Sequence, residues 1–232
     1  MKSLFPSGWW SFELEGYRPS DSTYELFLYE SLPPLNEDLF RGDFQWLLPI
    51  HEGTPGQAKK EAPFQDEETD EDVGETLLLD GLSAEIGRAG LTLPGPFVRF
   101  MADRDLRNEV PSCTDCRWDL SESPVPSALV PGACTIRFLR DQQDCLFWYL
   151  HLLPGGESEI LCSPLHFDDE ESEVTPDEVR DSTWACAPHF EHFVYRFWME
   201  NAIGALLIED EPFTFTPAQR AYLAHYEKLP RA

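Results

Sequence analysis

The stretch Cys145-Leu-Phe-Trp-Tyr-Leu-His-Leu152 is apolar nearly throughout and rich in aromatic residues. This composition predicts a β-strand that is covered on both faces. Two similar runs flank it, at Thr135–Leu139 and Glu159–Ser163. Turn-forming residues at 141–144 and 154–157 separate the three runs. The spacing therefore predicts an antiparallel meander of three strands.

A strongly amphipathic helix is expected from Pro188 to about residue 202, where large apolar residues recur at spacings of three and four. We expect its Phe193 and Phe197 side to pack on the sheet that contains Phe147 and Tyr149, since both surfaces are too apolar to face water. The recurring residues are Phe190, Phe193, Val194, Phe197 and Trp198.

Shorter helices are expected elsewhere in the chain. Leucines at helical spacing predict a helix over residues 76–88, and Pro94-Gly-Pro96 opens a short helix with an aromatic side. Thr175-Pro-Asp-Glu178 and Thr216-Pro-Ala-Gln219 each combine a capping residue, a proline in the first turn and a side chain that can complete a capping box. Both patterns are typical of a helix start.

The fold class that follows is α+β, with helices packed on a central antiparallel sheet and an N-terminal β extension. Residues 1–50 alternate aromatic and polar positions and form the expected β element. Four segments are expected in total: this element, an acidic linker over 51–75, an α+β domain over 76–210 and a C-terminal helix over 211–232.

The net charge of the chain limits the kinds of macromolecule that it is expected to bind. Lys and Arg number 17 against 43 Asp and Glu, which gives a formal net charge of -26. Nucleic acids and anionic membranes would be repelled, whereas a basic protein would be attracted. The first residues lack the apolar run of a signal peptide, so we expect a cytoplasmic protein with six reduced cysteines.

The motifs that could carry chemistry are incomplete. Cys113 and Cys116 have the spacing of half a zinc site, but two further ligands are missing nearby. His189 and His192 could share a metal on a helix, yet they lack the spacing of a metalloprotease motif. The acidic stretches at residues 66–72 and 168–173 lack the glycine turn of an EF-hand calcium loop. We therefore expect no catalytic residue, metal or cofactor, and a protein that is not an enzyme.

Three stretches in this order resemble the SUKH superfamily, which includes yeast cell-wall regulators and bacterial toxin-immunity proteins. They are the Leu93-Pro94 turn with its aromatic helix, the strand Leu146–Leu152, and the closing Phe190-x-x-Phe193 helix. The resemblance covers roughly residues 76–207. It implies an α+β fold and a protein that acts by binding, without catalytic residues.

The leading hypothesis is an acidic immunity-type protein that neutralises a toxin, such as a basic nuclease, by direct binding. The alternative is an intracellular regulatory or scaffold protein that holds partners together through its N-terminal β element. An exposed aromatic patch within residues 9–29 would favour the scaffold. The expected partner-binding residues are Asp70, Glu71, Asp72, Asp168, Asp169, Glu170, Glu171 and Glu173, together with Trp9 and Trp10.

Overall fold

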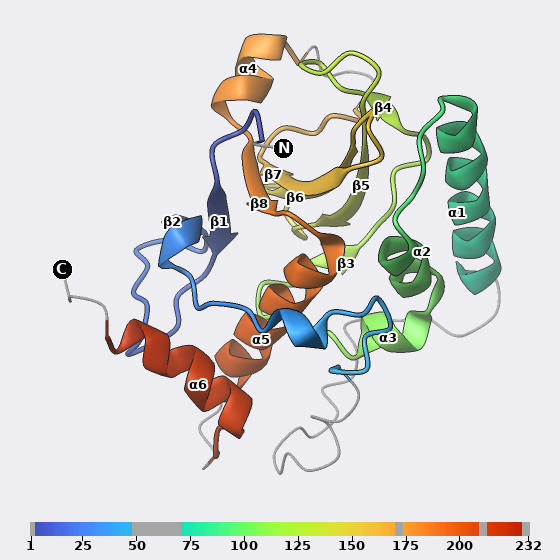
Figure 1. Ribbon diagram of the computed structural model, residues 1–232. Helices are drawn as coiled ribbons and strands as arrows, with labels where there is room; N and C mark the ends of the chain where they lie inside the picture. The colour runs from blue at the N-terminus through green and yellow to red at the C-terminus, as the bar shows by residue number, and fades with distance from the viewer. Residues whose placement is uncertain (1–2, 48–70, 170–173, 209–212, 229–232) are drawn as a thin grey trace.

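A six-stranded sheet, antiparallel throughout, lies at the centre of the protein (Figure 1). The strand order is β3-β5-β6-β7-β8, and β4 also pairs with β5. This arrangement confirms the predicted α+β class. The computed structural model describes residues 3–47, 71–169, 174–208 and 213–228, and within α1 it describes the side chains from Leu77 onward.

The three central strands confirm the predicted meander. They are β5 (Cys134–Arg140), β6 (Phe147–Leu152) and β7 (Ser158–Ser163). Every residue of β6 is buried, as its apolar composition predicts. A register shift between Arg137 and Leu139 interrupts the pairing of β5 with β6.

Three short strands widen the sheet beyond the prediction. β3 (Arg117–Trp118) and β4 (Val125–Pro126) pair with β5, and β8 (Trp184–Ala187) pairs with β7. Strands of two to four residues carry too little alternation for a periodic signal. Residues 103–133, which are rich in Pro, Ser and Asp, hold two of these strands and also the short helix α3 (Arg104–Asn108).

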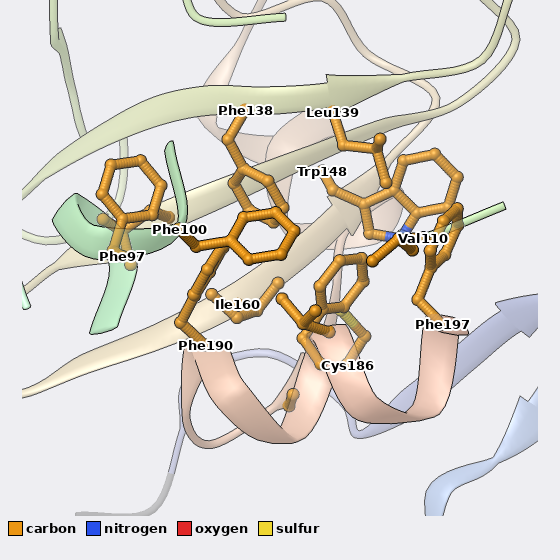
Figure 2. Close-up of a cluster of buried hydrophobic side chains, with 14 of the residues drawn as sticks. Phe97, Phe100, Val110, Phe138, Leu139, Trp148, Ile160, Cys186, Phe190 and Phe197 are labelled. Atoms are coloured by element: carbon orange, nitrogen blue, oxygen red, sulfur yellow. The ribbon is translucent and has the colours of Figure 1, made fainter. Parts of the chain in front are cut away.

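Helix α5 (Phe190–Ile208) packs against the central sheet and forms the main core with it (Figure 2). The ring centroids of Phe193 and Phe197 lie 6.3 Å and 6.1 Å from that of Trp148 on β6. The helix runs six residues past its predicted end because the apolar pattern continues through the buried Ile203 and Leu206. The prediction that this helix packs on the central sheet is confirmed.

The face of β6 that meets α5 differs from the expectation. Successive residues of a strand point to opposite faces, so Trp148 faces α5 while Phe147 and Tyr149 face the other side. There, Phe147 and Tyr149 form a second, smaller core with Phe5 and Val179. Both faces of the sheet are consequently covered.

Two further helices pack into the same buried cluster as α5 and complete the main core. α1 (Glu71–Arg88) buries Leu79, Leu82 and Ile86, and α2 (Gly95–Ala102) buries Phe97, Phe100 and Met101. Figure 2 shows Phe97 and Phe100 beside Phe138 of β5 and Phe190 of α5. α1 begins at Glu71, inside the segment expected to be an acidic linker, while residues 51–70 of that segment lie outside the described residues.

The two predicted capping boxes are confirmed. Thr175 caps α4 (Pro176–Asp181), and Thr216 caps α6 (Pro217–Tyr226). In each case the threonine hydroxyl accepts the backbone N–H of the third helical residue, and that residue's side chain accepts the N–H of the threonine. The capping residues therefore set where both helices begin.

The N-terminal segment shares the main core with the rest of the chain. It contains β1 (Gly8–Ser11), β2 (Glu25–Leu28) and two single-turn 3₁₀ helices, η1 (Tyr29–Ser31) and η2 (Glu37–Leu39). β1 and β2 pair antiparallel beside β8 (Figure 1). Trp9, Phe44 and Trp46 belong to the same buried cluster as Leu223 of α6. The expected N-terminal element and C-terminal helix are thus parts of one packed body.

Candidate protein-binding surface

The carboxylate of Glu200, on α5, joins the N-terminal segment to α6. Its oxygens accept hydrogen bonds from the Trp9 indole at 2.8 Å and from the Ser11 hydroxyl at 2.5 Å. Arg18 donates to both oxygens, at 2.7 Å and 2.9 Å, and the Tyr222 hydroxyl donates at 2.7 Å. Glu200 is completely buried, so this one carboxylate fixes how β1 and the turn after it sit on the helix.

The electrostatics of this cluster favour charged forms of the acid and the base. Burial opposes the charge of Glu200, but the neighbouring Arg18 and the hydrogen bonds from Arg18, Ser11 and Trp9 hold the pKa of that carboxyl below its usual range. Burial likewise opposes the charge of Arg18, and Glu200 outweighs it and raises the pKa of the guanidinium. Burial raises the pKa of Tyr222, which stays a neutral donor.

Trp9 is therefore wrong as a partner-binding residue. Its side chain is 2% exposed, because the indole N–H is committed to Glu200 and the ring packs against Phe193. Trp10 is half-buried and packs edge-on against Trp184 of β8, with ring centroids 5.2 Å apart. The aromatic residues of the N-terminal segment serve mainly to attach it to the core.

The exposed charged side chains of the N-terminal segment, from Ser3 to Phe40, are all acidic. Arg18, the one basic residue between Ser3 and Phe40, is 4% exposed and paired with Glu200. We call the exposed carboxylates between Glu13 and Glu30 the acidic N-terminal surface. Its members are Glu13, Glu15, Asp21, Glu25 and Glu30.

A strand edge and an exposed leucine lie within this surface. β2 pairs with β1 on one side, and β1 is the one strand it pairs with among the described residues. An unpaired strand edge offers backbone N–H and C=O groups to another chain. Leu28, at the end of β2, is 70% exposed. The segment therefore combines negative charge with an apolar contact point and a strand edge that no other described strand covers.

Asp168 is also wrong as a free acidic contact. The Arg137 side chain on β5 donates to both of its oxygens, at 2.8 to 3.1 Å, and the Asp168 side chain is 12% exposed. Arg137 also pairs with Asp119, which pairs with Arg140. Burial opposes the charge of Arg137, but Asp168 and Asp119 raise its pKa overall. The charge of Asp168 is thus neutralised where the loop meets the sheet.

The other predicted acidic contacts divide into three groups. Asp169 is half-buried, and its backbone N–H donates to the carbonyl of His166 at 3.4 Å. Glu71 and Asp72 lie in the first turn of α1, and their side chains are not described. The remaining four, Asp70, Glu170, Glu171 and Glu173, lie outside the described residues.

The pairs considered for metal binding have separate partners. Sγ of Cys113 donates to the carbonyl of Asn201 at 3.2 Å, whereas Sγ of Cys116 lies 3.3 Å from the Tyr24 hydroxyl. Nε2 of His192 lies 3.0 Å from Oε2 of Glu37, and burial lowers the pKa of His192 more than Glu37 raises it. The described residues contain no group of three or more potential ligands that could hold a metal ion. Nor does any described helix have the length and apolarity needed to cross a membrane.

The sequence patterns did not predict the acidic N-terminal surface. Its carboxylates are separated by aromatic and other residues, so they form no dense acidic stretch like residues 66–72, where six of seven residues are acidic. The available signal was the charge of the whole segment, since eight acids and two arginines lie between Glu13 and Asp43. A search for consecutive acids does not find carboxylates that are spread over a strand and the loops beside it, as these are.

Comparison of the chain with protein-family models, with curated proteins and with solved structures found no match. The resemblance to the SUKH superfamily stays a prediction.

Proposed function

We propose that this chain is an acidic, immunity-type protein that neutralises a toxin in the cytoplasm by covering a basic surface of the toxin. The action on the partner is non-enzymatic, because occupancy of the toxin's surface is itself the inhibition. The resemblance to the SUKH superfamily favours the same class of function.

The observation that carries the proposal is the way the fold sorts its charges. Acids outnumber bases by 43 to 17 in the chain. Among the described residues, however, more bases than acids are buried: four arginines against three carboxylates. The buried residues are Arg18, Arg107, Arg137 and Arg196, and Asp141, Glu191 and Glu200.

This sorting makes the exterior even more negative than the composition alone requires. A negative field accelerates encounter with a basic protein and repels phosphate backbones. The acidic N-terminal surface is where this field lies beside a free strand edge and the exposed Leu28. We place the first contact with the partner there.

The scaffold hypothesis called for an exposed aromatic patch within residues 9–29, and these residues form no such patch. The aromatic residues between Trp9 and Tyr29 are buried or half-buried against the core, so they form no exposed aromatic patch. A standing apolar interface normally exposes a contiguous patch. Binding driven by electrostatic attraction fits this surface better than binding through an apolar interface.

Co-expression with the products of neighbouring reading frames tests the proposal. We expect one of them to arrest growth of a host cell, and this chain to relieve the arrest and to form a stoichiometric complex with that product. A matched variant in which Glu13, Glu15, Glu25 and Glu30 are changed to Gln should relieve it less. Growth arrest that this chain never relieves would contradict the immunity function.

A further inference from the structure

A hydrogen-bonded chain of Ser127, His151 and Glu159 lies on the sheet face opposite α5. Oγ of Ser127 lies 3.2 Å from Nε2 of His151. Nδ1 of the same imidazole lies 3.0 Å from Oε1 of Glu159. A serine, a histidine and a carboxylate linked in this order form the arrangement that activates nucleophilic serines on unrelated folds.

The sheet brings together His151 of β6, Glu159 of β7 and Ser127 in the loop directly after β4. His151 of β6 stands directly opposite Glu159 of β7 in the antiparallel register. Ser127 follows β4, and its backbone N–H donates to the carbonyl of Ala133 at 2.9 Å, which fixes it beside the start of β5. The serine side chain then reaches across β5 to the imidazole. Rigid strands, and not a long loop, hold the histidine and the carboxylate.

The hydrogen bonds have a defined direction. A carboxylate only accepts, so Nδ1 of His151 carries a proton, and in the neutral imidazole this leaves Nε2 as the acceptor. The Ser127 hydroxyl therefore donates to Nε2, as a serine that is to be deprotonated must. Oγ of Ser127 also accepts the backbone N–H of Val130 at 3.3 Å, which holds the hydroxyl in place.

The surrounding residues exclude water from His151 and leave Ser127 partly exposed. His151 is 1% exposed, and the ring of Phe5 lies edge-on to it with centroids 5.9 Å apart. Ser127 is half-buried. Within the described part of the protein, the backbone N–H groups of Ala128 and Leu129, directly after the serine, donate to no acceptor. Backbone N–H groups next to a nucleophilic serine are the type of donor that stabilises an oxygen as it becomes negative.

We propose that Ser127 is a nucleophilic serine that accepts an acyl group from a small uncharged ester. Oγ bonds to the ester carbonyl carbon while its proton passes to Nε2 of His151, and the carbonyl π electrons move to oxygen. The electrons then reform the carbonyl, and the alcohol leaves with the proton from Nε2. Water removes the acyl group by the same steps, which regenerates the serine.

Each residue has a distinct role in this chemistry. Ser127 and His151 are the catalytic residues, and Glu159 is a positioning residue that holds the imidazole in the required tautomer. An anionic substrate is disfavoured because Glu159, hydrogen-bonded to His151, and the net charge of -26 repel it. This reactivity is independent of the proposed binding function and lies on a different part of the fold.

The test is labelling of the full, folded chain with an uncharged fluorophosphonate, which bonds to an activated serine through phosphorus and releases fluoride. We expect one adduct per chain, located on Ser127 by mass spectrometry of peptides. Heat-unfolded protein should give none. Folded protein that remains unlabelled after hours with excess probe would overturn the proposal.

Variants separate activation from simple exposure. Ser127→Ala should abolish the adduct, whereas Ser123→Ala, at an exposed serine nearby, should leave it unchanged. Glu159→Gln should slow labelling at least tenfold, and Glu159→Asp should restore part of the rate because it keeps the charge. Thermal unfolding of each variant checks that it folds. Equal labelling rates in the native chain and Glu159→Gln would refute the positioning role.

Discussion

Arg18 and Glu200 form a buried ion pair, with Nη1 and Oε1 2.7 Å apart, between residues separated by 182 positions in the sequence. Both side chains are at most 5% exposed. Removing one member leaves the other charged without a partner, so Arg18→Met should lower the free energy of unfolding by about 3 to 5 kcal/mol. Denaturant titration measures this loss.

The double variant Arg18→Met with Glu200→Leu is the control for that loss. It removes both charges at once, so it should cost less than the two single variants added together. Additive effects would show that the two residues do not act as a pair.

Acid should weaken the protein partly through Glu200. The pKa of this carboxyl is lowered in the folded state from an ordinary value of 4.5. A lowered pKa contributes stability that is fully present above about pH 4.5 and is lost as the pH falls through the folded-state value. Glu200→Gln should therefore lose stability less steeply than the native chain below about pH 4.5. Parallel pH profiles from thermal unfolding would contradict this assignment.

Phe193 should matter more than any exposed apolar residue. It is fully buried between α5 and the sheet, so Phe193→Ala should cost about 3 to 5 kcal/mol through lost contacts and the cavity that remains. Leu28→Ala is the matched control, because Leu28 is 70% exposed and its loss should change stability by less than about 0.5 kcal/mol. Denaturant midpoints compare the two directly.

Charge reversal should distinguish the acidic N-terminal surface from the ion-paired loop. Changing Glu13, Glu15, Glu25 and Glu30 to Lys should lower the association rate with a basic partner by about tenfold and leave stability nearly unchanged. High salt should have the same effect on the native chain, since it screens exposed charges. Rates from stopped-flow mixing that respond to neither change would rule out electrostatic steering.

Asp168→Lys is the contrasting variant. It should lower stability by about 3 kcal/mol because it leaves Arg137 facing a like charge in a partly buried site. Glu227→Lys, at an exposed position on the last turn before the chain end, should affect neither property.

The six cysteines should react with a thiol reagent in a fixed order. All six are free, and Cys145 is the exposed one. Burial raises the pKa of Cys134 to about 11 and raises those of Cys162 and Cys186 well above the ordinary value. In native protein Cys145 should react first, and these three only after unfolding. A count below six in denaturant would indicate a disulfide or an oxidised thiol.

The parts of the fold that follow from local chemistry could be predicted from sequence. The meander, the α2 helix after Pro94, both capping boxes and the α5 helix depend on residues within a few positions of one another. The face of β6 that meets α5 could not be chosen, because Phe147 and Trp148 are both large and apolar and a strand buried on both sides gives no alternation to read.

The candidate binding surface depends on long-range contacts that sequence patterns do not contain. Trp9 looks like an exposed anchor until Glu200 is placed 2.8 Å from its indole nitrogen. Asp168 looks like part of a solvated acidic run until Arg137 on β5 is placed against it. In both cases a partner distant in sequence turned a candidate contact into part of the interior.

The Glu200 cluster also determines the order in which parts of the chain can pack together during its synthesis. The N-terminal donors, Trp9, Ser11 and Arg18, leave the ribosome long before their acceptor on α5 and before Tyr222 on α6. Contacts of such long sequence separation form late and slow folding. The N-terminal segment therefore takes its final position on the core only after synthesis has passed α5 and α6.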